Sequence, residues 1–385
     1  MKKIIFLIFC VIGLTSCDLF NPYGNSNIPV PAKVTINKPE FVSKILWQHS
    51  AGKGSDNAYL LLAPALNAAV IYTVDQEGLI KATNVVDGKT QWKISLVNGG
   101  KSSLSSEDNI LAVVDAKAIL YVLNSSNGKI IWKTQVSNQV LAAPTIAAHL
   151  IMTKTIDGTV SAFDRATGKL IWTYQHNVPN LMLRASSAVN VLNDVAYVGF
   201  SDGSVVALNV NNGVELWTQQ VAEPEGFAAI QRLVDIDARL IVTPQRIYVA
   251  TYQGNVAALD RATGKIIWQQ KNSVYTDIIN NKNILYAITA DGTFSAYQQE
   301  TGKIVWQKKQ LAWHFLSGAS LYDEQFLIVG DIEGNIYFIS SKDGSIVSAK
   351  VISKKSMILA SPLIYQNIIL VIDAQGNLTA LTANI

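Results

Sequence analysis

Short hydrophobic stretches separated by glycine turns recur from about residue 41 to the end of the chain. In one unit the apolar stretch 284–289 leads to a turn at 291–292, a second stretch covers 293–297, and a third covers 303–307. Stretches of this length, rich in β-branched and aromatic residues and bounded by turn residues, predict strands rather than helices. The Asp-Gly pair at 291–292 favours a two-residue hairpin loop, because glycine accepts a positive φ. The pattern therefore indicates an all-β fold.

The same unit occurs eight times when the chain is aligned on the glycine of its first turn. The aligned positions lie 38 to 51 residues apart, which is a period typical of a four-stranded propeller blade. The second unit has Ala118 where the others have glycine, so we expect its turn to be built differently. The eight aligned positions are Gly78, Ala118, Gly158, Gly203, Gly254, Gly292, Gly334 and Gly376.

A second landmark, Gly-x-x-x-Trp, follows in each of the first six units. The seventh copy has Ser348 in place of the tryptophan, and the chain ends before an eighth copy. A strand at 41–49, with Trp47 near its end, precedes the first unit without a repeat of its own. We predict that this strand completes the last blade, because closure of the ring removes open sheet edges. The predicted fold, over residues 39–385, is an all-β, eight-bladed β-propeller of four-stranded antiparallel blades, with the tryptophans packed between blades.

The N-terminus has the pattern of an export signal. Two lysines precede an apolar run at 4–13, which is too short to span a membrane. The string Leu-Thr-Ser-Cys at 14–17 resembles a bacterial lipobox, which implies a signal peptide at 1–16 and lipidation of Cys17. Residues 17–38 contain Pro, Gly and Asn without periodicity, and we expect them to form a flexible tether.

Composition and charge exclude several classes of function. The formal charge of +3 falls to +1 when the two lysines of the signal peptide are removed, so nothing favours nucleic acid, which needs a basic face. The only cysteine besides Cys17 is Cys10 in the signal, so we expect neither a disulfide nor a thiolate metal site. The four histidines are scattered, and no nucleophile elbow, phosphate loop or metal-ligand spacing occurs. We therefore predict a protein that is not an enzyme and binds no metal or cofactor.

Two stretches depart from the repeat period, at 177–188 and 222–240. In a repeat protein such departures are where a binding surface is added. Apolar anchors beside an arginine and carboxylates suit a protein-binding patch. The alternative interpretation is that the leucines are strand residues facing the core and the arginine pairs structurally with an aspartate. On physical grounds alone both interpretations stay open. The residues concerned are Leu181, Leu183, Arg184, Arg232, Asp235 and Asp237.

The lipobox, the tether, the propeller repeats and the two irregular stretches together resemble the BamB family, which are lipoproteins of the outer-membrane β-barrel assembly machinery. The most specific matches are Asn-Val-Pro at 177–179, followed by Leu181-x-Leu183-Arg184, and Arg232-Leu233-x-Asp235-x-Asp237. The resemblance implies docking to the POTRA region of BamA, the barrel-inserting subunit. Five residues are implied for that contact, with Arg232 added because it shares the second motif: Leu181, Leu183, Arg184, Asp235 and Asp237.

The resemblance also implies a place in the cell envelope. The protein would be anchored in the outer membrane through the lipid on Cys17 and would face the periplasm. There it would assist the folding and insertion of β-barrel proteins and contact nascent outer-membrane proteins. Asp18 directly follows the cysteine. In enterobacterial sorting an aspartate at that position favours retention at the inner membrane, which therefore stays open as an alternative.

Two other functions remain as alternatives. The string Ala-x-Asp-x-x-Thr-Gly-Lys-x-x-Trp at 162–172 and 258–268 resembles the tryptophan-docking repeat of quinoprotein dehydrogenases. Those enzymes are eight-bladed propellers that bind pyrroloquinoline quinone and calcium, and the family implies a vicinal disulfide over the quinone. This sequence lacks the cysteines for it, which disfavours a dehydrogenase. The second alternative is a structural propeller of the envelope that binds another partner.

Overall fold

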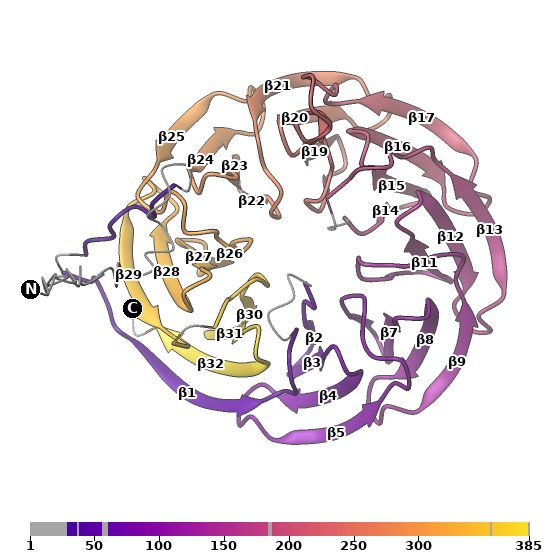
Figure 1. Ribbon diagram of the computed structural model, residues 1–385, viewed down its shortest axis with the longest axis horizontal. Helices are drawn as coiled ribbons and strands as arrows, with labels where there is room; N and C mark the ends of the chain where they lie inside the picture. Colours follow the sequence, from indigo (N-terminus) through magenta and orange to yellow (C-terminus); the bar gives the residue numbers. More distant parts are fainter. Residues whose placement is uncertain (1–28, 37, 56–60, 184–186, 355, 384–385) are drawn as a thin grey trace, which may run out of the picture.

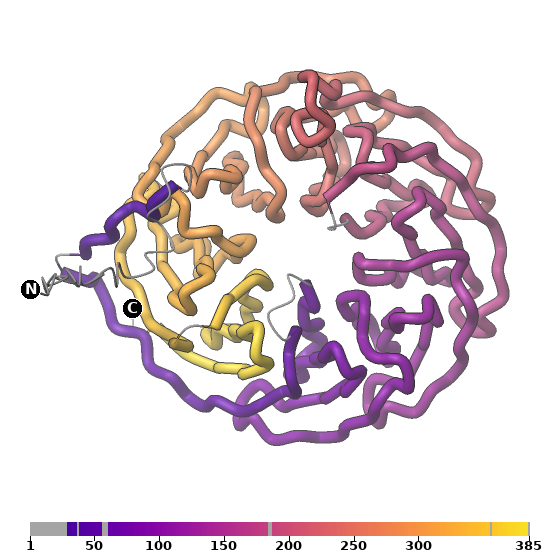
Figure 2. The backbone as a smooth tube through the Cα atoms, viewed as in Figure 1, coloured from indigo at the N-terminus to yellow at the C-terminus, as the bar shows by residue number. Residues whose placement is uncertain are grey.

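Eight four-stranded antiparallel sheets follow one another around a central axis and form a closed ring (Figure 1). The computed structural model describes residues 29–36, 38–55, 61–183, 187–354 and 356–383. The chain makes one circuit of the ring and returns to its start, where β1 (Ser43–Ser50) lies beside β32 (Asn377–Ala383) (Figure 2). The predicted all-β, eight-bladed propeller is therefore confirmed.

The blades share one plan, which is a short inner strand, two buried central strands and an outer strand with many exposed side chains. The strands of the first four blades, from the inside outward, are β2 (Ala65–Asn67), β3 (Val70–Val74), β4 (Leu79–Asn84) and β5 (Thr90–Ser95); β6 (Ser105–Glu107), β7 (Ile110–Val114), β8 (Ile119–Asn124) and β9 (Ile130–Gln135); β10 (Thr145–Ala147), β11 (Leu150–Lys154), β12 (Thr159–Asp164) and β13 (Leu170–Gln175); and β14 (Asn190–Leu192), β15 (Val195–Gly199), β16 (Ser204–Asn209) and β17 (Glu215–Gln220).

The other four blades repeat this plan, and a short 3₁₀ helix, η1 (Ala229–Arg232), precedes the fifth blade. Only the last blade takes its outer strand, β1, from the N-terminal end of the propeller. The remaining strands are β18 (Ile241–Val242), β19 (Arg246–Ala250), β20 (Gly254–Asp260) and β21 (Ile266–Asn272); β22 (Ile279–Asn281), β23 (Ile284–Ile288), β24 (Phe294–Gln298) and β25 (Ile304–Lys308); β26 (Ser320–Tyr322), β27 (Phe326–Gly330), β28 (Asn335–Ser340) and β29 (Ile346–Val351); and β30 (Leu363–Tyr365) and β31 (Ile368–Ile372).

The N-terminal strand closes the ring, as the orphan strand at 41–49 predicted. β1 pairs antiparallel with β32 from Ser43 opposite Ala383 to Ser50 opposite Asn377, and the register shifts at Leu46. The two ends of the propeller are thus hydrogen-bonded within one sheet. The last blade therefore has four hydrogen-bonded strands, like each of the other seven.

Each tryptophan of an outer strand packs against a turn glycine of the next blade. The indole Nε1 of Trp92 donates to the carbonyl oxygen of Ser125 at 2.9 Å. A Cβ atom on Gly128, which has a φ of +71°, would lie 2.7 Å from the Trp92 ring, so the turn requires glycine. The predicted packing of the tryptophans between blades is therefore confirmed. The pairs are Trp47 with Gly88, Trp92 with Gly128, Trp132 with Gly168, Trp172 with Gly213, Trp217 with Gly264, Trp268 with Gly302, and Trp306 with Gly344.

A phenylalanine covers the seventh blade, where the tryptophan is missing. Ser348 in β29 pairs with Phe338 in β28. The hydroxyl of Ser348 donates to the carbonyl oxygen of Phe41 at 2.9 Å. The Phe41 ring meets Phe326 and Phe338 edge to face, with centroids 5.3 and 5.1 Å away. Phe41 lies just before β1, which completes the eighth blade. Its ring therefore buries a surface of the seventh blade.

The turn of the second unit is not built differently, so that prediction was wrong. Ala118 has a φ of +59°, in the same left-handed region as the glycines of the other turns. Its amide donates to the carbonyl oxygen of Asp115 at 3.1 Å, as the amide of Gly158 does to Thr155 at 3.1 Å. One Asp115 carboxylate oxygen also accepts hydrogen bonds from the amides of Lys117 and Ile119, which stabilises a conformation that an L-residue otherwise disfavours.

The first hairpin loop is one residue longer than the sequence predicted. In the sixth blade the amide of Thr289 donates to the carbonyl oxygen of Thr293, and the amide of Gly292 donates back to Thr289. Residues 290–292 therefore form a three-residue loop, which ends in a left-handed glycine with a φ of +81°. This geometry is the next most common hairpin connection after the two-residue loops.

Part of the predicted tether lies against the propeller. The amide of Ala32 donates to the carbonyl oxygen of Ala312 at 2.9 Å, and His314 Nε2 lies 2.8 Å from the carbonyl oxygen of Ala32. Val34 packs against the hydrophobic core between the sixth and seventh blades. The signal peptide, Cys17 and Asp18 lie outside the described residues. Within the described residues, no helix is long and apolar enough to cross a membrane.

Candidate functional site

The two stretches that break the repeat period both connect one blade to the next. The first follows β13 and leads into β14, and we call residues 177–183 of it the docking segment. The second follows β17 and leads into β18, contains η1, and is called here the supporting segment (222–240). Both run from an outer strand to the inner strand of the following blade, so both cross the same face of the ring (Figure 1).

A buried carboxylate joins the two segments. The amide of Leu183 donates a hydrogen bond of 3.1 Å to Asp235 Oδ1, across 52 positions of sequence. Beside it, the amide of Ile236 donates to the carbonyl oxygen of Phe200 at 3.2 Å. A Cβ atom on Gly199 would lie 2.3 Å from the Ile236 side chain, so the supporting segment packs tightly against the end of β15. The structure therefore brings together the two stretches that the sequence singled out.

The residues expected to bind a partner divide into exposed and buried ones. Leu181 is 49% exposed, and Leu183 is half-buried. Arg232 is exposed at the end of η1. Asp235 and Asp237 are buried, with 0% and 8% of their surface accessible. Arg184 lies outside the described residues.

This division corrects both sequence-based interpretations in part. The leucines do not face the core from a strand, because residues 181–183 belong to no strand and Leu181 is half exposed. The carboxylates are not at the surface either, and Asp235 contacts the docking segment from beneath through the Leu183 amide. The sequence could not separate these cases, because outside a strand no alternation tells which side of the chain is buried.

The supporting segment exposes two large apolar side chains that sequence reasoning did not single out as binding residues. Phe227 is fully exposed and Ile230, in η1, is 65% exposed. Large exposed apolar side chains next to polar ones are typical of surfaces that bind other proteins. The sequence did give one signal for Phe227 and Ile230, because both lie in a stretch that departs from the repeat period. Their exposure, however, could only be seen in the fold.

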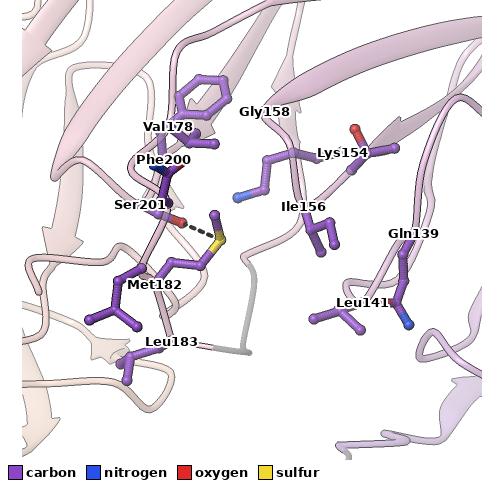
Figure 3. A pocket seen from close by; sticks show the side chains of 13 residues that line it. Gln139, Leu141, Lys154, Ile156, Gly158, Val178, Met182, Leu183, Phe200 and Ser201 are labelled. Carbon is purple, nitrogen blue, oxygen red and sulfur yellow. Dashed lines mark hydrogen bonds between the residues drawn. The ribbon is translucent and has the colours of Figure 1, made fainter.

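A mostly apolar cleft of about 220 Å³ lies behind the docking segment. Figure 3 shows Leu141 and Ile156 on one side of the cleft and Met182 and Phe200 on the other. The hydroxyl of Ser201 donates a long hydrogen bond of 3.7 Å to the Met182 sulfur. Because Leu181 and Leu183 also line the cleft, the exposed part of the docking segment continues into this recess.

Among the residues that the structure describes, Lys154 is the one charged side chain that lines the cleft. It is 7% exposed at the end of β11, and its ammonium donates to the carbonyl oxygen of Gly199 at 2.6 Å. Burial lowers the pKa of Lys154 to about 8, against the opposing effect of Asp237 and Asp235, whose negative charges favour the ammonium. The ammonium also lies over the Phe200 ring, 5.7 Å from its centroid.

Burial shifts the pKa values of both aspartates upward. It raises the pKa of Asp237 to about 7, and the neighbouring charge of Asp235 adds to this while Lys154 opposes it. It raises the pKa of Asp235 to about 6, which the Ser201 side chain, the Leu183 amide and the charge of Lys154 partly offset. Two carboxyl groups and one ammonium thus share a poorly solvated space beneath the docking segment. We call Lys154, Asp235 and Asp237 the buried charge cluster.

A histidine forms a second polar contact at the start of the docking segment. His176 Nε2 lies 2.8 Å from Asp202 Oδ2, and the imidazole stacks on Phe200 with centroids 4.1 Å apart. Ser204 Oγ lies 3.1 Å from the same ring nitrogen, and these contacts hold the end of β13 against the fourth blade. Across the described ranges, no group of three or more His, Cys, Asp and Glu side chains is placed to hold a metal ion.

Known proteins match this chain over most of its length. A family model described as "Outer membrane protein assembly factor BamB" matches residues 76–308 and 242–384 in two overlapping segments. The outer membrane protein assembly factor BamB of Legionella pneumophila (strain Paris) is 40% identical over 354 residues, covering 91% of this chain and 92% of the relative.

Solved structures show the same fold at lower identity. The crystal structure of BamB from Moraxella catarrhalis has a TM-score of 0.80 at 20% identity, covering 89% of this chain and 100% of that one. A europium-containing methanol dehydrogenase has a TM-score of 0.74 at 12% identity, covering 88% of this chain and 93% of that one. Because a propeller serves both an assembly factor and an enzyme, the fold alone does not decide between them.

Proposed function

Since this chain belongs to the family of the outer membrane protein assembly factor BamB, we propose that it is a non-catalytic scaffold in outer-membrane protein assembly that docks onto the POTRA region of BamA. The observation that carries the proposal is the hydrogen bond from the Leu183 amide to Asp235, which links the only two irregular segments that the sequence singled out. It fixes a non-strand segment on a rigid ring with Leu181 half exposed. Preorganisation of this kind favours binding, because less chain entropy is lost on docking.

The docking residues have different roles in this proposal. Leu181 and Leu183 are the apolar anchors, and Arg232 with Arg184 supplies charge-assisted hydrogen bonds at the rim. Asp235 and Asp237, being buried, hold the docking segment in place without touching the partner. The exposed Phe227 and Ile230 extend the apolar part of the surface.

The test replaces Leu181 with alanine and measures the affinity of the full chain for BamA. Truncation of an apolar anchor costs about 1–2 kcal/mol, which is roughly a five- to thirtyfold loss of affinity. The matched control is Leu216→Ala in β17, because Leu216 is 51% exposed and Leu181 is 49% exposed. Docking through this surface predicts a loss for Leu181→Ala only. Equal affinity of the two variants would refute the assignment of the surface.

We propose that the lipid on Cys17 anchors the protein in the outer membrane, facing the periplasm, with Asp18 leaving the inner membrane as the alternative. A Cys17→Ser variant should lose radiolabelled palmitate and be recovered from the soluble periplasmic fraction. Separation of the two membranes by density then decides between them for the unmodified protein. If the unmodified protein is recovered with the inner membrane, the outer-membrane assignment is wrong, but the proposal of a lipid anchor on Cys17 still holds.

A direct contact with nascent outer-membrane proteins is part of the same proposal. The outer strands expose neighbouring apolar side chains, such as Ile130 and Ile131 in β9 at 50% and 48% and Ile304 and Val305 in β25 at 52% and 48%. An exposed strand edge with such side chains can take up an extended segment as an added strand. Photocrosslinkers along β9 and β25 should capture substrates in transit. Capture of BamA alone would contradict this role.

The absence of catalysis is proposed on the same grounds and is simple to test. Pyrroloquinoline quinone and calcium are added to the purified chain, and dye-linked oxidation of alcohols and sugars is followed. A scaffold gives no turnover above the rate without protein, whereas steady turnover would favour the dehydrogenase. A propeller that binds some other envelope partner would instead show no BamA after purification from membranes.

A further inference from the structure

The position of Lys154 in the repeat sets it apart from the rest of the ring. It is the last residue of β11 and pairs with Val160 at the start of the next strand. The equivalent residue of every other blade is apolar or glycine, and a charged residue occurs there only in the third blade. The seven equivalents are Val74, Val114, Gly199, Ala250, Ile288, Gly330 and Ile372.

A charge at this place is not required by the propeller, because seven blades form without one. It also has a cost, since an ammonium that is 7% exposed has lost most of its hydration. Within the described part of the chain the ammonium makes one hydrogen bond, to the carbonyl oxygen of Gly199, which satisfies one of its three donors. The lysine therefore calls for an explanation outside the core of the third blade.

The explanation lies in the carboxylates that face it from the supporting segment. Within the described residues, Asp235 Oδ2 and Asp237 Oδ2 are buried without a hydrogen-bond partner. Two buried carboxylates repel one another, and each one left uncompensated costs several kcal/mol. The positive charge of Lys154 acts on both of them and lowers that cost. A further titratable pair, His176 with Asp202, contacts the same Phe200 ring through the His176 imidazole.

We propose that Lys154 is a positioning residue for partner docking, whose positive charge stabilises the buried Asp235 and Asp237 so that Asp235 holds the Leu183 amide and the docking segment presents Leu181. The proposal rests on the proposed function, because it assumes that the docking segment is the surface that binds the partner. Lys154 itself stays beneath that surface. It acts through charge on the two aspartates, and through them on the backbone at Leu183.

The shifts in pKa give this proposal a signature that a space-filling role lacks. At pH 7.0 Asp235, with a pKa of about 6, is mostly ionised, and Asp237, with a pKa of about 7, is about half ionised. At pH 5.0 both are protonated and no longer need a counter-charge. Loss of the lysine charge should therefore matter at neutral pH and cease to matter in acid.

The experiment compares Lys154→Met with the unmodified full chain in binding to BamA at pH 7.0 and pH 5.0. Methionine keeps an unbranched side chain that is one heavy atom shorter, and it removes the charge. The affinity ratio of the two proteins at one pH cancels any titration of BamA. We expect Lys154→Met to bind about tenfold more weakly at pH 7.0 and within about threefold at pH 5.0, where tenfold corresponds to about 1.4 kcal/mol. The matched control is Lys133→Met in β9, an exposed lysine whose loss changes the net charge equally.

A second comparison covers the case in which Lys154→Met is poorly folded. In the background of Asp235→Asn with Asp237→Asn, the carboxylates are neutral amides, so adding Lys154→Met should change the affinity by less than twofold. A tenfold further loss in that background would show that the lysine fills space, and would overturn the proposal. So would equal binding of Lys154→Met and the unmodified protein at pH 7.0. In either of these cases the Leu181→Ala variant shows which proposal has failed. Normal binding of Leu181→Ala would refute the docking surface itself. Weak binding of Leu181→Ala would keep the docking surface and refute only the role of Lys154.

Discussion

The indole nitrogen of Trp47 donates a hydrogen bond of 2.9 Å to the carbonyl oxygen of Val85, which joins the last blade to the first. Trp47 lies in β1, the strand that completes the eighth blade, and its ring covers Gly88 of the first blade. A single side chain near the N-terminus therefore contributes to the sheet that closes the ring and to the interface between its two ends.

Replacing Trp47 with alanine should destabilise the propeller by about 3–5 kcal/mol, because a large buried ring is lost and its neighbours cannot fill the space. Trp47 is 9% exposed, so most of that ring is buried. The measurement is denaturant unfolding followed by tryptophan fluorescence. The matched comparison is Trp306→Ala, which removes the same contact between the sixth and seventh blades. If Trp47→Ala unfolds like the unmodified protein, the N-terminal strand does not secure the ring.

Replacing Ala118 with glycine should stabilise the protein by about 0.5–1 kcal/mol. Ala118 has a φ of +59°, which costs an L-residue roughly 1–2 kcal/mol, and the greater freedom of glycine in the unfolded chain cancels part of the gain. Gly158→Ala, the reverse change in the next blade, should cost more, since its Cβ would lie 2.3 Å from the carbonyl oxygen of His176. Thermal unfolding of both variants provides the check. A destabilised Ala118→Gly would mean that the turn is not strained.

Replacing Asp237 with asparagine should stabilise the protein at pH 7.5 by roughly 2–4 kcal/mol, from a pKa raised by burial to about 7. The folded protein binds this proton more tightly than the unfolded chain, so stability rises as pH falls from about 7 towards 4, where the unfolded carboxyl titrates. The asparagine variant should lose this dependence. Asp373→Asn is the control, because Asp373 Oδ2 accepts a hydrogen bond of 2.9 Å from Asn377 Nδ2, which an asparagine NH₂ group in its place cannot accept, so that variant should be destabilised. If Asp237→Asn is more stable than the unmodified protein but binds BamA more weakly, then Asp237 serves docking at the expense of stability.

Replacing His314 with alanine should release the chain before β1. Burial disfavours the imidazolium, but hydrogen bonds to Asp331 and to the Ala32 carbonyl oxygen raise the pKa of His314 above its usual value, with Glu333 adding to the effect. A raised histidine pKa gives stability that is complete below about 6.5 and is lost as pH rises through the folded value. Trypsin should cut after the exposed Lys33 faster in His314→Ala than in the unmodified protein.

The difference in cleavage rate should be larger at pH 6 than at pH 8.5, since only the charged ring donates from both nitrogens. His149→Ala, which removes an exposed histidine, serves as the control. Equal cleavage of all three proteins at both pH values would show that His314 does not hold Ala32. The described part of the predicted tether would then be attached by Val34 and the backbone alone.

By itself the sequence determined the ring, its eight blades and the strand that closes it. These features rest on local signals, because each turn needs a left-handed residue and seven of the eight blade interfaces place a tryptophan over a turn glycine such as Gly128. Local signals repeat with the blade, so they can be read by aligning the chain with itself. The order of the strands within a blade follows from the same repeat. The structure departed from the sequence prediction only in details, such as the turn at Ala118, which was expected to differ from the other turns and does not.

Only the tertiary structure decided what lies beneath the docking segment. Asp235 and Asp237 were predicted to be site residues, but their burial depends on how the supporting segment packs over Gly199. Lys154 was overlooked, although it breaks an apolar position of the repeat, because its meaning depends on carboxylates about 80 positions later in the chain. Strand periodicity fixes which face a residue occupies, whereas charges brought together by irregular segments depend on contacts between blades that no local pattern encodes.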